Sequence, residues 1–349
     1  MFDFKTRLKK LRSELKAKSI ESLLVTNESN VTYLSGFTGS DSVLFITPDS
    51  QFFLTDSRYT QEAKKSVRGF AILEVVSSTY DVIGKIACKN GIRKIGFESM
   101  NLPYGVIKNL ESYIGKAKLL PFNNIVENLR AVKDKEEIAR IERSVACAKK
   151  VLKNIVGEVA PGVSEKKLSG RIECEFIANG AKSGFKPIVA CAENSSKPHA
   201  HPTDRKIAKN DIVMIDMGCT LDSYNSDITR MVLTGKIKDK IREIYLVVKA
   251  AQEKAFDNIR PGRKISAVDS AGRQHIADKG YGKFFGHSMG HGIGLDVHEE
   301  PSVSGRSTGI LKPGMVFTVE PAIYVPGLGG IRIEDMVLVT EKGFEILTI

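Results

Sequence analysis

The sequence predicts an α+β protein in which a larger, internally repeated C-terminal domain follows a smaller α/β N-terminal domain. Two observations lead to this prediction. Short apolar runs rich in β-branched residues alternate with longer segments of helical periodicity along the chain. In the second part of the chain, acidic residues interrupt strand-like runs twice, in the same order. The 349 residues are enough for two domains of ordinary size.

The internal repeat is the stronger observation. The run IVMID at 212–216 matches VFTVE at 316–320, and DITRMVLT, from residue 227, matches EDMVLVT, from residue 334. Upstream, a Pro-Gly turn at 161–162 matches one at 261–262, and each precedes a predicted helix. These matches share an offset of about one hundred residues, which predicts two similar halves related by a pseudo-twofold axis around a shared cleft.

Residues 1–123 form the predicted N-terminal domain. Phe4, Leu8, Leu11 and Leu15 recur at helical spacing among basic residues, which predicts an amphipathic helix rather than a signal peptide. Strands are expected at SLLVT, SVLFIT, QFFLTD, FAILEVV and KIGFE, with helices at 57–65 and 80–90. No histidine precedes His199, so we expect this domain to shape or oligomerise the protein rather than to carry its chemistry.

Residues 124–349 form the predicted second domain, and the polar run 121–137 marks its boundary. Asp134 and Glu137 have the spacing of a capping pair and predict the start of a long helix. Further helices are expected at about 164–179, 237–259 and 266–279.

Two acids, Asp216 and Asp227, interrupt strand-like runs that are expected to pair as a hairpin. Buried carboxylates that face one another repel unless a proton, an arginine or a metal cation neutralises them. His291, Glu320 and Glu334 lie in similar apolar patterns. Four carboxylates with one neutral imidazole suit two divalent cations. The alternative is that these acids form salt bridges at strand ends.

The stretch GHSMGHGIGLDVHEEP holds His287, His291 and His298 among glycines that let the backbone approach a ligand. It also matches the GxSxG elbow of serine hydrolases around Ser288. That alternative is disfavoured, because the histidines that follow Ser288 lie too close in sequence to complete a triad.

A loop before the first acidic strand carries His199 and His201. We expect His199 to orient a substrate carbonyl or to shuttle a proton, and His201 to lie on the surface.

Composition excludes several other classes. The net charge of +11 comes from dispersed lysines mixed with acids on helix faces, which argues against nucleic-acid binding. No window is apolar enough for a transmembrane helix, so no membrane partner is expected. Five cysteines without a CxxC pair argue against a disulfide framework and fit the cytoplasm.

Together, the motifs IDMG, NSDITR, GHSMGHGIGLDVHEEP, VEP and RIED resemble those of the pita-bread metallopeptidases. That family includes Xaa-Pro aminopeptidase (aminopeptidase P), prolidase and methionine aminopeptidase. The resemblance spans the second domain and implies the pita-bread fold. The N-terminal segments LLVTNESNVTYLSGFTGS and FFLTDSRY are similar to the creatinase-type N-terminal domain, which methionine aminopeptidase generally lacks.

The resemblance also implies roles for particular residues. The metal ligands would be Asp216, Asp227, His291, Glu320 and Glu334. Glu320 would also accept the proton of the attacking water, and His199, His287 and His298 would match the substrate-cleft histidines. Arg332 would brace the carboxylates, and Tyr324 would match a cleft tyrosine.

The implied reaction is hydrolysis of the bond between an N-terminal residue and a following proline. Oxygen-rich ligation favours Mn²⁺, with Co²⁺, Fe²⁺ or Zn²⁺ as alternatives. Prolidases usually carry an arginine just after the HExP motif, where this chain has Ser302. This departure favours longer Xaa-Pro peptides over dipeptides as substrates. Arg306 is close enough in sequence to keep an Xaa-Pro dipeptidase (prolidase) as the alternative. The resemblance further implies a homodimer. The alternative from another class, a non-catalytic peptide-binding module, is disfavoured because no ligand is missing.

Overall fold

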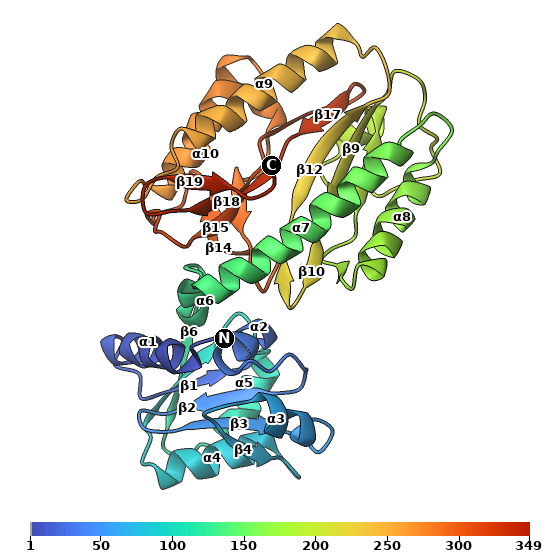
Figure 1. Ribbon diagram of the computed structural model, residues 1–349. Helices are drawn as coiled ribbons and strands as arrows, with labels where there is room; N and C mark the ends of the chain where they lie inside the picture. The colour runs from blue at the N-terminus through green and yellow to red at the C-terminus, as the bar shows by residue number, and fades with distance from the viewer. Residues whose placement is uncertain (1) are drawn as a thin grey trace. The chain divides into compact units, whose positions relative to one another are not determined.

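The computed structural model describes residues 2–349, which divide into two compact units. One unit ends at Arg130 and the other runs from Ala131 to Ile349 (Figure 1). Within residues 2–349, no helix combines the length and the apolar character that crossing a membrane requires.

The first unit is a six-stranded mixed sheet with helices around it, in the strand order β4-β3-β2-β1-β5-β6. The central strand β1 pairs parallel with β5 and antiparallel with β2. The strands are β1 (Ser22–Val25), β2 (Val43–Ile46), β3 (Gln51–Thr55), β4 (Ala71–Glu74), β5 (Lys94–Glu98) and β6 (Lys118–Phe122). The helices are α1 (Phe4–Ala17), α2 (Glu28–Ser35), α3 (Thr60–Ser66), α4 (Thr79–Lys89), α5 (Tyr104–Glu111) and α6 (Ile125–Arg130).

Helix α6 occupies part of the run that the sequence predicted as a polar boundary. Its residues Ile125 and Val126 are buried, and the helix packs against α1 and α2. The Arg130 guanidinium donates to the side chain of Asn30 on α2 at 2.8 Å. The chain therefore divides into its two compact units between residues 130 and 131, whereas the sequence analysis set the boundary between 123 and 124.

The second unit consists of two α+β halves. Its helices are α7 (Lys135–Glu158), α8 (Glu165–Ala178), α9 (Asp239–Phe256) and α10 (Ile265–Asp278), with 3₁₀ turns η1 (Ala192–Ser196) and η2 (Gly282–Phe284). The strands of the first half are β7 (Lys182–Ser183), β8 (Ile188–Cys191), β9 (Ile212–Met217), β10 (Cys219–Leu221), β11 (Tyr224–Asn225) and β12 (Ile228–Leu233). Those of the second half are β13 (Gly290–Gly292), β14 (Glu299–Val303), β15 (Val316–Val319), β16 (Ala322–Val325), β17 (Gly329–Arg332), β18 (Asp335–Val339) and β19 (Phe344–Ile346).

The two halves repeat one pattern, a helix pair packed on a three-strand core. In the first half, α7 and α8 pack on the sheet β12-β9-β8. In the second half, α9 and α10 pack on a sheet that contains β13-β15-β18. Figure 1 shows the helix pairs on opposite sides of the central strands. The halves meet where Glu334 donates its backbone N–H to the Thr229 carbonyl at 3.3 Å.

Helix α7 begins where the sequence predicted. The Asp134 side chain accepts from the backbone N–H of Glu137 at 2.9 Å, and the Glu137 carboxylate accepts from the backbone N–H of Asp134 at 3.0 Å. These reciprocal bonds satisfy two donors that a helix N-terminus otherwise leaves open. The predicted capping pair is therefore confirmed.

The predicted hairpin between the two aspartates differs in one respect. Strands β9 and β12 do pair antiparallel, with Thr229 opposite Asp216. However, the chain between them forms a separate hairpin, β10–β11, instead of a short turn. Asp222 and Ser223 have positive φ angles of 50° and 69°, as a two-residue hairpin turn requires. The tight turn therefore lies at these two residues, at the tip of the additional β10–β11 hairpin.

Candidate metal centre

The five predicted ligands lie at the ends of the central strands of the second unit. Asp216 is on β9, Asp227 immediately precedes β12, and His291 is on β13. Glu320 immediately follows β15, and Glu334 immediately precedes β18. All five line one cavity of about 490 Å³. The equivalent strands of the two halves thus deliver their acids to the same space.

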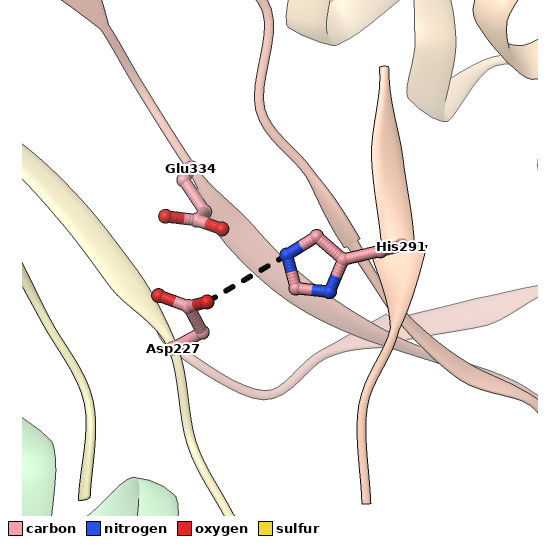
Figure 2. A group of neighbouring side chains, drawn as sticks. All are labelled: Asp227, His291 and Glu334. Atoms are coloured by element: carbon pink, nitrogen blue, oxygen red, sulfur yellow. Dashed lines mark ion pairs between the residues drawn. The ribbon is translucent and has the colours of Figure 1, made fainter. Parts of the chain in front are cut away.

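Three of these residues form a compact group. One ligand atom from each of Asp227, His291 and Glu334 lies within 4.8 Å of the others. Figure 2 shows the imidazole of His291 turned toward the two carboxylates. The His291 Nε2 atom lies 3.7 Å from Asp227 Oδ2 and 3.4 Å from Glu320 Oε1.

The orientation of His291 suits a metal ligand. Its Nδ1 atom lies 3.1 Å from the Gly292 carbonyl oxygen, which can only accept, so Nδ1 carries the proton. Burial, with the neighbouring His298, lowers the pKa of His291 to about 4, so the ring is neutral at pH 7. The Nε2 lone pair therefore faces the carboxyl groups of Asp227 and Glu320, an arrangement that a cation satisfies.

The carboxylates give a second test of the fit. Within residues 2–349, Asp216 Oδ1 and Asp227 Oδ1 are buried without a hydrogen-bond partner. Burial, with the nearby charge of Glu334, raises the pKa of Asp227, and burial with the charge of Asp216 raises the pKa of Glu334 to about 7. Such a set of crowded acids fits divalent cations, because these relieve the repulsion and fill the open oxygen positions.

Arg332 and Thr229 hold the carboxylates from behind. Arg332 pairs with Asp216 through its guanidinium and donates from Nε to the Thr229 hydroxyl at 3.1 Å. The Thr229 hydroxyl in turn donates to Glu334 at 2.6 Å. Arg332, for which the resemblance implied a bracing role, contacts one predicted ligand directly, whereas sequence reasoning missed Thr229. The only signal for Thr229 in the sequence was the Thr-Arg pair that follows Asp227 and Ile228.

Arg332 also begins a chain of hydrogen bonds to a cleft histidine. It donates to the Tyr324 hydroxyl at 2.6 Å, and this hydroxyl lies 3.2 Å from His287 Nε2. His287 Nδ1 lies 2.9 Å from the Ser288 carbonyl oxygen, so Nδ1 carries the proton and Nε2 accepts from Tyr324. Burial raises the pKa of Tyr324 to about 12 and lowers that of His287 to about 4.

The other two predicted histidines lie at the open side of the cavity. His199 and His298 both line it, and both are exposed. The His298 ring lies against the His291 ring, with the centroids 4.0 Å apart. His201, expected on the surface, is exposed but also lines the cavity.

The structure does not support a serine nucleophile. Ser288 lines the cavity, but within residues 2–349 its hydroxyl makes no hydrogen bond to a histidine. The nearby His287 is engaged through Tyr324 and the Ser288 carbonyl. Nucleophilic catalysis requires the hydroxyl and its base to be hydrogen-bonded partners, so the GxSxG match has no mechanistic basis here.

The repeated halves and the carboxylate–histidine centre define a metal-dependent hydrolase of the pita-bread class. Residues 139–341 match metallopeptidase family M24, and residues 7–132 match the creatinase/prolidase N-terminal domain. The chain belongs to metallopeptidase family M24, and it is an enzyme with the predicted fold.

Named relatives have the same architecture over their full length. A structure of the Xaa-Pro dipeptidase of Bacillus anthracis superposes with a TM-score of 0.96 at 37% identity, covering 99% of this chain and 98% of that one. The Xaa-Pro dipeptidase of Pyrococcus horikoshii is 34% identical over 98% of this chain and 96% of its own. An X-Pro aminopeptidase of Thermotoga maritima has a TM-score of 0.88 at 35% identity, covering 97% of both chains.

Proposed function

We propose that this chain is an Xaa-Pro dipeptidase, which cleaves the bond between an N-terminal residue and a C-terminal proline. The observation that carries the proposal is the group of four carboxylates and one oriented histidine in a cavity large enough for a small peptide. The named dipeptidases favour this alternative over the aminopeptidase that Ser302 had suggested. Ser302 lines the cavity, whereas Arg306 is exposed and outside its lining.

The ligands of two divalent cations would be Asp216, Asp227, His291, Glu320 and Glu334. When bound, such cations lower the pKa of a water molecule to near neutrality and polarise the scissile carbonyl. Mn²⁺ is the metal we propose, because oxygen donors outnumber nitrogen donors in this set.

The residues around this centre would handle the protons. Glu320 would accept the proton of the attacking water, since its Oε1 atom lies at the centre, 3.4 Å from His291 Nε2. The prolyl nitrogen has no hydrogen and must gain a proton before it leaves. His298, with His199 second, would relay that proton, a role supported by their exposed positions in the cavity lining. Neutral His287 accepts from Tyr324 and donates from Nδ1 to the Ser288 carbonyl, with this nitrogen 3.9 Å from Glu320 Oε2.

We further propose that the protein is a cytoplasmic homodimer and that the N-terminal domain predicted at residues 1–123 corresponds to the first compact unit, which ends at Arg130. The cytoplasmic proposal is supported by the five free cysteines. The dimer rests on the family resemblance, and sedimentation of the purified protein tests it.

The test of the activity compares an Xaa-Pro dipeptide with an Xaa-Pro-Xaa tripeptide at matched Mn²⁺ concentration. We expect a higher kcat/KM for the dipeptide and loss of activity with a chelator. A clear preference for the tripeptide would instead identify an Xaa-Pro aminopeptidase, the alternative that the Thermotoga maritima structure supports. Cleavage of neither peptide, with metal bound, would favour a binding module.

A further inference from the structure

The two permanently charged cations of the cavity wall differ in whether they have hydrogen-bond partners. Arg332 and Lys186 are the lining residues with a permanent positive charge. Arg332 is 4% exposed, and its guanidinium is bonded to Asp216, Thr229, Tyr324 and the Pro198 carbonyl. Lys186 is exposed, and within residues 2–349 its Nζ atom takes part in no hydrogen bond or ion pair. One cation of the wall is therefore free to meet a ligand.

The backbone places this lysine beside the metal centre. Lys186 lies two residues before Ile188, the first residue of β8, and Ile188 pairs directly with Asp216 on β9. Two residues of extended chain span about 7 Å, and the lysine side chain is long enough to cover much of that distance. Phe185, Pro187 and Ile188 line the same cavity, so the whole segment forms one wall of it.

We propose that Lys186 binds the free carboxylate of the proline in an Xaa-Pro dipeptide. This inference rests on the proposed function and adds the residue that makes the enzyme prefer dipeptides over longer peptides. In a dipeptide the carboxylate lies one residue beyond the scissile carbonyl, about 3.5 Å along the chain. In a longer peptide an uncharged amide takes that position. An ammonium group next to this position therefore favours the dipeptide, and the cavity strengthens the attraction relative to open water.

The other polar groups of the wall do not replace this charge. Ser302 is uncharged, and its backbone N–H is already bonded to the Glu300 carboxylate. His199 and His201 also line the cavity, but a neutral imidazole carries no charge, whereas the lysine side chain is an ammonium at neutral pH. Lys186 thus supplies the constant positive charge that a carboxylate subsite needs.

The experiment measures kcat/KM for Ala-Pro and for its amide, Ala-Pro-NH₂, in the Mn²⁺-loaded protein. We expect the ratio of the two values to fall about tenfold in Lys186→Met, because one charge-assisted hydrogen bond to the carboxylate is lost. Lys186→Arg keeps the charge and should keep most of the preference. Lys182→Met is the matched control, since Lys182 is an exposed lysine on β7 outside the cavity lining.

Salt gives an independent measurement. The KM for Ala-Pro should rise with ionic strength in the wild type and in Lys186→Arg, and much less in Lys186→Met. An Ala-Pro preference that Lys186→Met retains overturns this inference and leaves the proposed function standing. A wild type that prefers the amide, or shows no preference, overturns it as well. A wild type that cleaves neither compound overturns the proposed function and this inference with it.

Discussion

Asp227, one of the five proposed ligands, lies in an environment that opposes its charge. It is 5% exposed, one of its oxygens lacks a hydrogen-bond partner within residues 2–349, and three other acids surround it. Only a cation makes its ionised form stable at that place.

Replacement of Asp227 by Asn should therefore remove bound metal and peptidase activity together. Metal content by elemental analysis and kcat/KM on an Xaa-Pro dipeptide check this expectation. Asp278→Asn, at the exposed end of α10, is the control and should retain both. Full activity in Asp227→Asn would show that the metal centre is assigned wrongly.

Tyr324 tests the residues around the centre rather than the ligands. Its hydroxyl links Arg332 to His287, at 2.6 and 3.2 Å. Tyr324→Phe should lower kcat/KM by about tenfold or more, since a buried guanidinium N–H and the His287 ring lose their common partner. Metal content should stay at the wild-type level. Loss of metal in this variant would instead assign Tyr324 to the support of the ligands.

At this scale, motif spacing predicted which side chains gather, but not how they are oriented. The resemblance named His291 and Arg332 correctly as residues of one cavity. The tautomer of His291 depends on the Gly292 carbonyl, and the position of Glu334 depends on Thr229 from the other half. Thr229 and Glu334 are 105 residues apart, and the direction of the neighbouring Gly292 carbonyl depends on strand pairing, so neither contact had a local signal in the sequence.

Among the elements, the loop after β8 is held by a single buried acid. Glu165, at the start of α8, accepts from the backbone N–H groups of Cys191 and Thr203, at 2.7 and 2.9 Å, and from the Thr203 hydroxyl. The loop between these residues carries His199 into the cavity. Burial opposes the charge of Glu165, but the bonds from Thr203 and Cys191 outweigh it and lower its pKa.

Glu165→Gln should destabilise the fold by about 2 kcal/mol and raise KM, because an amide NH₂ group would face donors that need an acceptor. The melting temperature and the substrate dependence of the rate measure the two effects. Glu193→Gln changes an exposed acid on the same loop and should leave both unchanged. Equal behaviour of the two variants would mean that Glu165 does not position the loop.

Elements with local signals were predicted best. The α7 start was predictable because both capping partners lie within one helical turn. Helix α2 was missed, although Asn27 caps it by accepting from the Asn30 N–H at 3.0 Å. Two of its buried positions, Asn30 and Ser35, hold polar side chains that are satisfied by hydrogen bonds. The eight residues of the helix therefore show little apolar periodicity. Tertiary contacts there override the pattern on which the prediction relied.

For the whole second unit, the repeat explains why charge can be concentrated at its centre. Each half buries apolar residues under its own helix pair, and Ile212 and Met214 of β9 also join the core of the second half. Each half presents its acids to the junction. The cost of that arrangement is charge repulsion between the halves, which stability measurements can detect when metal is removed.

The metal-free protein should lose stability as pH rises from 5 to 8. Burial, with the charge of Asp216, raises the pKa of Glu334 from an ordinary value of 4.5 to about 7. The folded state therefore holds a proton that the unfolded chain has released between these values, and stability falls as pH rises through that window.

Glu334→Gln keeps the shape of the side chain without its titration. With a chelator present, the melting temperature of this variant should therefore fall less between pH 5 and pH 8 than that of the wild type. Mn²⁺ should raise the melting temperature of the wild type most strongly at pH 8, because the ionised carboxylates are the form that binds the metal. Parallel pH profiles for the two chelated proteins would show that Glu334 is not a strained acid at the junction of the halves.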